Sequence, residues 1–325
     1  MQGVKEKALE LLESQKVQRV LGWKRGEFFY DLTPGTFESV QEVEREFQYG
    51  VFAGANLSKY CIAESKKDGV TAVFLKPCDT YSFVQLLKEY KIKREKVYIV
   101  GVQCGGMCDM ERIRARGISG ATAVEEAGED LRISTIYGEE TMKKADALLL
   151  KCATCKSKKL VIFDELLGEQ GEDCAGCGRF EEVERLEALS PEERFSFWRG
   201  ELSRCIRCNA CRNVCPACTC ETCVFDNHDL GTDNKAPASD FEENFFHIIR
   251  AFHVTSRCTD CGECSRVCPQ HIPLHLLNRK LIRDTNELYG AYQAGADLET
   301  KPPLMDYRTD DCEPSVVYER GGAKG

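Results

Sequence analysis

Apolar residues recur at helical spacing near the start of the chain and then in short runs, and this alternation predicts an α/β domain. Residues 4–16 place Val4, Ala8 and Leu11 at helical intervals with charged residues between them. The predicted strands are residues 17–23, 27–32, 70–75 and 97–102. Helical patterns at residues 56–66 and around Phe83 separate the later strands, so a mainly parallel sheet is expected.

The last third of the chain carries helical patterns only. Ser190 is a good N-cap, Pro191 occupies the first helical position and Glu193 can close a capping box, so a helix is predicted to begin there. Further helices are expected over residues 243–254 and after Pro273. Residues 227–240 are polar and predict a loop.

These patterns divide the 325 residues into three parts. Residues 1–180 are expected to form the α/β domain, and residues 121–150 to add further α/β material to it. Residues 188–289 are expected to form a helical domain. Residues 290–325 are rich in Gly, Pro and Asp without periodicity, which predicts an extended tail.

Two cysteine runs of the same spacing lie in the helical part. Each is Cys-x2-Cys-x2-Cys-x3-Cys-Pro, the ligand spacing of [4Fe–4S] clusters, in which the fourth cysteine of one run binds the cluster of the other run. One cluster is assigned to Cys205, Cys208, Cys211 and Cys268. The second is assigned to Cys258, Cys261, Cys264 and Cys215. Zinc is the alternative, but zinc sites usually use two Cys-x2-Cys pairs. Because helices separate the runs, the prediction is an α-helical ferredoxin domain with two [4Fe–4S] clusters.

The composition agrees with metal binding rather than disulfides. The chain has 20 cysteines, and their clustering in short motifs indicates metal ligands in a reducing, anaerobic cytoplasm. A net charge of −9 argues against a nucleic-acid surface. No run of about 18 apolar residues occurs, so no membrane span is expected.

Four more cysteines form two pairs, Cys152/Cys155 and Cys174/Cys177. Taken alone, their spacing fits a zinc ribbon. A second interpretation joins Cys152 and Cys155 to Cys78 and Cys104, which follow two predicted strands, and gives a third [4Fe–4S] cluster. Parallel strands present their carboxyl ends at one edge, where ligands bind, and both interpretations remain open on spacing.

Residues 56–167 resemble the beta subunit of coenzyme F420 hydrogenase/dehydrogenase, the family that includes formate dehydrogenase beta subunits. Three segments carry the resemblance: Lys76-Pro-Cys-Asp79, Gly101-Val-Gln-Cys-Gly-Gly106, and Lys151-Cys-Ala-Thr-Cys155 before Asp164-Glu165. The C-terminal third resembles the ferredoxin-type small subunit of heterodisulfide reductase. The resemblance implies a flavin beside a [4Fe–4S] cluster, and it favours the Cys78/Cys104/Cys152/Cys155 ligand set over zinc.

Candidate flavin-binding residues come from the same segments. They are Lys76, Gly101, Gly105 and Gly106. Glycines after a strand let the backbone approach a phosphate or a flavin ring, although no Gly-x-Gly-x-x-Gly motif occurs and a tight turn beside a cluster cysteine explains them equally well. FAD is therefore expected from the resemblance rather than from the residues.

The predicted function is electron transfer within an oxidoreductase complex. A flavin would exchange hydride with a soluble carrier, and the clusters would connect it to a partner subunit of hydrogenase, formate dehydrogenase or heterodisulfide reductase type. The sequence shows no set of residues that would catalyse a reaction on its own, so no catalytic residues are assigned. A flavin-free electron-transfer subunit and a zinc-containing scaffold are the alternatives.

Several residues stay without an assigned role. Cys218, Cys220 and Cys223 follow the first run and are expected to be thiols near a cluster or ligands of an additional metal. Cys108 matches no family position, and Cys61 and Cys312 are expected to be ordinary apolar residues. The helix over residues 243–254 carries His247 and His253, which are expected to be packed or hydrogen-bonded.

Overall fold

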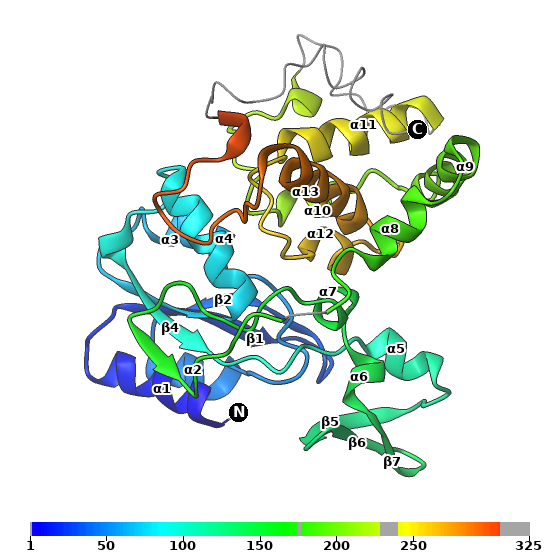
Figure 1. Ribbon diagram of the computed structural model, residues 1–325. Coiled ribbons are helices and arrows are strands. Elements are labelled where there is room, and N and C mark those ends of the chain that lie inside the picture. Colours follow the sequence, from blue (N-terminus) through cyan, green and yellow to red (C-terminus); the bar gives the residue numbers. More distant parts are fainter. Residues whose placement is uncertain (1, 175–176, 228–239, 306–325) are drawn as a thin grey trace.

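A five-stranded mixed sheet organises the first half of the molecule in the computed structural model, which describes residues 2–174, 177–227 and 240–305 (Figure 1). Its strands are β1 (Arg19–Arg25), β2 (Leu32–Phe37), β3 (Thr71–Leu75), β4 (Val97–Val102) and β8 (Glu165–Leu167). They lie in the order β2-β1-β3-β4-β8. Only β2 runs antiparallel to its neighbour, so the expectation of a mainly parallel sheet is correct for this sheet.

The predicted strand over residues 27–32 is wrong. These residues form a turn, in which the Gly26 amide donates to the Asp31 carbonyl at 2.7 Å and the Asp31 amide donates to the Phe28 carbonyl at 3.0 Å. The strand begins only at Leu32 and pairs with β1 from there. The apolar side chains that suggested a strand pack beside the turn instead, where Phe29 and Tyr30 contact Phe52.

The central strands are apolar because both faces of the sheet are covered. Every residue of β3 is buried, as expected for a parallel strand between helices. Helices α1 (Gln2–Glu13) and α4 (Pro77–Lys88) both pack against β3. Shorter helices α2 (Val40–Glu46) and α3 (Cys61–Glu64) complete this part. Trp23, Phe74 and Phe83 are fully buried at its centre.

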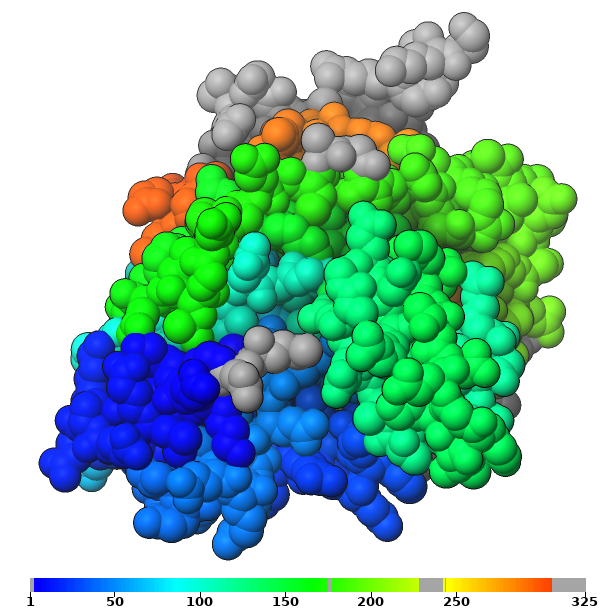
Figure 2. Space-filling view, turned by 90° about the horizontal axis from the view of Figure 1, so that it is seen from below, coloured from blue at the N-terminus to red at the C-terminus, as the bar shows by residue number. Residues whose placement is uncertain are grey.

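Residues 121–143 form a separate antiparallel sheet rather than an extension of the first. Its strands are β5 (Ala121–Ala127), β6 (Asp130–Thr135) and β7 (Gly138–Lys143), with β6 in the middle. Helices α5 (Met110–Ala115) and α6 (Lys144–Ala147) flank it, and Ile113, Leu131 and Ile133 form its small core. Seen from below, this region and the blue N-terminal region occupy neighbouring parts of one face (Figure 2).

The regular elements described after β8 are all helical. The longer ones are α8 (Glu181–Glu187), α9 (Pro191–Leu202), α11 (Asp240–His253) and α13 (His275–Tyr289). Three short helices carry cysteines: α7 (Leu150–Ala153), which precedes β8, and α10 (Ala210–Asn213) and α12 (Glu263–Arg266), which follow it. The capping box at the start of α9 is confirmed: the Glu193 amide donates to Ser190 Oγ at 3.2 Å and the Ser190 amide donates to the Glu193 carboxylate at 3.0 Å.

The predicted loop over residues 227–240 and the predicted tail fall largely outside the described residues. In the described ranges, no helix has the length and apolar character needed to cross a bilayer.

The helical part packs on the carboxyl edge of the five-stranded sheet (Figure 1). Arg257 donates to Glu89 at 2.6 and 2.8 Å, and the hydroxyls of Ser82 and Thr259 lie 2.8 Å apart. Lys59 donates to the Cys218 carbonyl at 2.9 Å. The contacts place the cysteine loops after β3 and β4 directly against the cysteine runs of the helical part.

Candidate functional site

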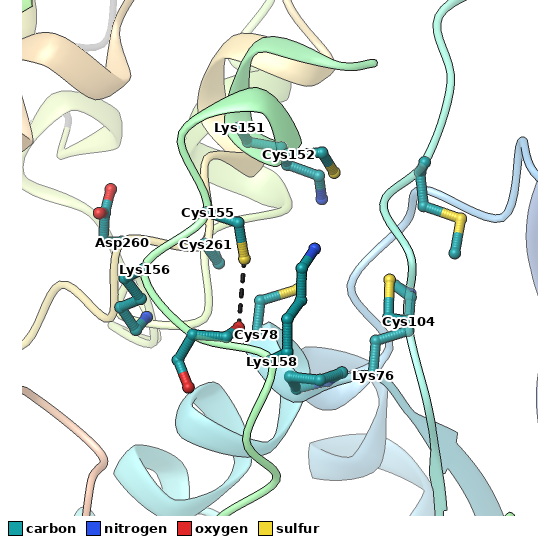
Figure 3. A pocket seen from close by; sticks show the side chains of 13 residues that line it. Lys76, Cys78, Cys104, Lys151, Cys152, Cys155, Lys156, Lys158, Asp260 and Cys261 are labelled. Carbon is teal, nitrogen blue, oxygen red and sulfur yellow. Dashed lines mark hydrogen bonds between the residues drawn. The ribbon is translucent and has the colours of Figure 1, made fainter. Parts of the chain in front are cut away.

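Four cysteines from three separate segments line one pocket (Figure 3). Cys78 lies at the start of α4, directly after β3, and Cys104 follows β4. Cys152 lies in α7 and Cys155 follows it. Figure 3 shows their sulfur atoms around a space into which Lys158 points. The structure therefore brings together the four residues expected to hold the third cluster.

The electrostatics of this pocket fit an anionic metal group. Burial raises the pKa of the Cys78 and Cys104 thiols, so they are protonated when no metal is bound. Burial lowers the pKa of Lys158, but the Cys155, Cys104, Cys152 and Cys174 thiols raise it more, and the ammonium stays charged. Thiols become thiolates when they bind metal, and the half-buried Lys158 among them then offsets the negative charge. The donor set is therefore suitable for a [4Fe–4S] cluster.

The zinc alternative also has some geometric support. The Cys174 amide donates to the Lys156 carbonyl at 3.1 Å, so the second cysteine pair folds back beside the first. Burial raises the pKa of Cys174, and the nearby Cys155 and Cys177 thiols raise it further. Cys78 and Cys104 line the pocket together with Cys152 and Cys155. Cys174 lies near Cys155 but is not among the residues that line that pocket. Both ligand sets include Cys152 and Cys155. Because Cys78 and Cys104 line the same pocket as these two residues, the geometry favours the [4Fe–4S] cluster over zinc.

The two ferredoxin-type runs have the same backbone conformation. The residue before each second cysteine has a left-handed φ, 52° at Arg207 and 55° at Asp260. The residue after it is left-handed as well, 61° at Asn209 and 67° at Gly262. Such angles are unusual for residues other than glycine and turn the chain around a central point. A Cβ on Gly262 would lie 2.3 Å from Lys151, which explains why the second run has glycine there.

The fourth cysteine of each run lies with the other run. Burial raises the pKa of Cys211, and the neighbouring Cys205, Cys268 and Cys208 thiols raise it further. Burial likewise raises the pKa of three thiols in the second run, and the Cys215 thiol adds to each. These three are Cys258, Cys261 and Cys264. Cys268 packs in one apolar cluster with Cys205 and Cys211, and Cys215 packs with Cys258, as crossed ligation requires. In the described ranges no three such side chains have the spacing of ligands around a bound ion, so crossed ligation stays a prediction.

A buried ion pair joins the four-cysteine pocket, which Cys78, Cys104, Cys152 and Cys155 line, to the second run. Lys151, beside Cys152, donates to the Glu263 carboxylate and, at 2.8 Å, to the Gly54 carbonyl. Glu263 lies between Cys261 and Cys264 and also accepts from Arg266 at 2.8 Å. Cys261 itself lines the pocket of the other four cysteines. The four-cysteine pocket and the second run are therefore in direct contact.

Sequence reasoning missed Lys151, Lys158 and Glu263. Their position beside cysteines in the sequence was a signal, because charged residues close to metal-binding thiolates usually compensate the negative charge or orient the ligands.

The structure also places other residues to which the sequence assigned no role. Cys61 is buried in the sheet core, as expected, and the His247 ring Nε2 lies 3.2 Å from Cys205 Sγ. Cys218, Cys220 and Cys223 line a surface cavity of about 520 Å³.

A second hollow, of about 590 Å³, opens on the other side of Cys104. It is unusually rich in glycine; the glycines that line it are Gly3, Gly50, Gly105, Gly106, Gly168 and Gly171. Cys104, Met107 and Lys158 line both this hollow and the cysteine pocket.

The four predicted flavin-binding residues do not all reach this hollow. Gly105 and Gly106 line it. Gly101 lies inside β4, where a Cβ would meet Leu160 at 2.6 Å. Lys76 lines the cysteine pocket instead, and its ammonium pairs with Asp79 at 2.9 Å.

Comparison with known proteins supports iron–sulfur binding by the helical part. Residues 201–272 match the 4Fe-4S dicluster domain family. Over 91% of its length the chain is 25% identical to F420-dependent formate dehydrogenase subunit beta of Methanocaldococcus jannaschii, and it covers 92% of that protein. The resemblance to the beta-subunit family is confirmed. A second beta-subunit relative, F420-dependent formate dehydrogenase 1 subunit beta of Methanococcus maripaludis, is 26% identical across 90% of both chains.

Among solved structures, the chain is similar to part of the F420-reducing [NiFe] hydrogenase complex of Methanosarcina barkeri. The match covers 57% of this chain and 76% of that chain at 13% identity, with a TM-score of 0.37. The TM-score is too low for the two structures to be compared element by element.

Proposed function

We propose that this chain is the flavin- and iron–sulfur-containing electron-transfer subunit of a cytoplasmic oxidoreductase complex. It would pass electrons between the deazaflavin F420, a soluble hydride carrier, and a partner catalytic subunit of formate dehydrogenase type. The single observation that carries this proposal is that cysteines of the sheet part and Cys261 of the second run line one pocket, beside which the Lys151–Glu263 ion pair joins the two parts. The two relatives, both beta subunits of F420-dependent formate dehydrogenases, supply the carrier and the class of partner.

The glycine-lined hollow is the proposed flavin site. Its volume, about 590 Å³, falls in the range of cofactor pockets. Gly50 has open space where a Cβ would be, and a Cβ on Gly105 would meet only the mobile end of Lys144. Backbone amides can therefore approach a cofactor closely, and Lys158 supplies positive charge for phosphate groups or for a reduced flavin ring. Lys144 also lines the hollow but pairs there with Glu126. A flavin accepts two electrons as hydride and releases them singly, which suits a site next to one-electron clusters.

This chain's residues would set the order of the electron carriers. Cys104 lines both the flavin hollow and the four-cysteine pocket, so the flavin and the third cluster would be neighbours. Cys261 lines that same pocket, so the second-run cluster would come next. The first-run cluster, which includes the exposed Cys208, would lie closest to the surface and to a partner.

The experiment is a dye-linked assay on the anaerobically purified protein. Reduced F420 should reduce a viologen dye at a rate that depends on bound flavin. Protein that retains both flavin and iron yet shows no reaction with reduced F420 would contradict the proposed carrier. Protein that carries iron but no flavin would point instead to a flavin-free electron-transfer subunit.

A further inference from the structure

Arg250 is a buried cation to which the proposed electron transfer assigns no role. It lies on α11 and is 3% exposed. None of its three guanidinium nitrogens has a hydrogen-bond partner among the residues that the structure describes. An unpaired buried charge is strongly destabilising, so such a group is retained only where something compensates it.

The surroundings of Arg250 consist of cysteines from both runs. Phe246, one turn before Arg250 on α11, packs in one cluster with Cys211 and Cys264, whereas Val254, one turn after it, packs with Cys215. Arg250 and Cys218 line one cavity. Cys211 belongs to the ligand set of the first run, whereas Cys264 and Cys215 belong to that of the second. The guanidinium therefore lies between the two places where clusters are expected.

Other arginines near these runs are already paired. Arg257 binds Glu89, and Arg279 donates to Asp260 at 2.9 Å. Arg250 thus stands apart from these two because the groups that face it are thiols. A guanidinium has five N–H donors, enough to reach sulfur atoms on two sides.

We propose that Arg250 donates hydrogen bonds to sulfur atoms of both clusters and raises the reduction potential of each. The inference rests on the proposed function, since it requires clusters on both runs. A cluster held by four thiolates becomes more negative on reduction, and a nearby fixed cation stabilises the reduced form more than the oxidised form. Hydrogen bonds to cluster sulfur act in the same direction, and both are known determinants of cluster potential.

The test is a potentiometric titration of the anaerobic protein monitored by EPR. Arg250→Gln removes the charge, and Arg250→Lys keeps the charge but loses the guanidinium fork. Arg194→Gln is the matched control, because Arg194 pairs with Glu187 on the outer side of the helical part. In Arg250→Gln both cluster potentials should fall, each by at least a tenfold change in the one-electron equilibrium constant, which corresponds to about 59 mV. Arg250→Lys should show a smaller fall.

Unchanged potentials in Arg250→Gln, or an equal change in Arg194→Gln, would overturn the proposal. If Arg250→Gln binds no iron, Arg250→Lys must still assemble both clusters, because the charge is retained. Loss of iron in both variants would show that the side chain serves packing alone and would also overturn it. Parent protein without cluster signals would instead reject the proposed function itself.

Discussion

Lys151 and Glu263 form an ion pair in the interior, between helix α7, which carries Cys152, and the run that carries Cys261 and Cys264. Both side chains are at most 5% exposed. Burial lowers the pKa of Lys151, but Glu263 and the nearby thiols raise it more; burial raises the pKa of Glu263, but Arg266 and Lys151 lower it more. Both groups are therefore charged, and the pair couples the sheet to the helical part.

Glu263→Gln should destabilise the protein by about 3–5 kcal/mol, because it leaves Lys151 as an uncompensated buried charge. The measurement is anaerobic urea denaturation of the purified protein. Glu182→Gln is the matched control, since Glu182 pairs with Arg185 and both side chains are more than half exposed, so the loss there should be about 1 kcal/mol or less. Equal effects of the two substitutions would contradict the structural role given to Glu263.

Cys268→Ser should damage the cluster built mainly on the first run, because Cys268 packs in one cluster with Cys205 and Cys211. EPR of the reduced protein should lose the signal that a Cys208→Ser variant also loses. Cys61→Ala is the control: Cys61 is buried in the sheet core, and its removal should leave the iron content unchanged. Loss of the signal that Cys261→Ser removes, with the Cys208-dependent signal intact, would refute the crossed ligation.

Gly105→Val should abolish flavin binding while the iron content stays near that of the parent. The added side chain would project into the glycine-lined hollow, where only Lys144 lies close to the new Cβ. Flavin released by acid and measured by fluorescence, together with iron analysis, provides the readout. Gly200→Ala, at an open position on α9, should change neither quantity. A flavin content that survives Gly105→Val would place the cofactor elsewhere.

His275 should make the stability depend on pH. Burial lowers its pKa from 6.5 to about 4, and its Nδ1 lies 2.8 Å from Ser265 Oγ. Between those two pH values the unfolded chain binds a proton that the folded chain does not, so the free energy of unfolding falls as the pH drops below about 6.5. At pH 5.5 this loss is roughly 1 kcal/mol for a group of this kind.

His275→Gln should therefore narrow the difference in urea stability between pH 7.5 and pH 5.5. His253→Gln, at an exposed position on the neighbouring helix, should leave that difference unchanged. A His275→Gln variant with the parent's full pH dependence would show that other groups cause it.

Local patterns predicted the elements well where a rule acts within a few residues. The capping box of Ser190 and Glu193 marked a helix start, and the β-branched run ending at Leu75 marked a central strand. The error at residues 27–32 has a physical cause, because aromatic residues such as Phe29 suit a strand and a packed turn equally. Sequence alone does not tell which of the two the surroundings favour.

The site was predictable only where spacing encodes it. The spacing of the two runs predicts crossed ligand sets, and the structure brings the two runs together, while the ligation itself stays a prediction. The Lys151–Glu263 pair joins residues 112 positions apart, and no local rule links them. Gly101 and Gly105 looked alike in sequence, yet one packs under Leu160 and the other opens onto a hollow.

Iron and acid-labile sulfide analysis of the anaerobically purified chain tests the central claim most directly. Three [4Fe–4S] clusters predict about twelve irons and about twelve sulfides per chain, falling to about eight of each in a Cys78→Ser/Cys104→Ser variant. A parent protein that is colourless, contains zinc and releases no sulfide would contradict it.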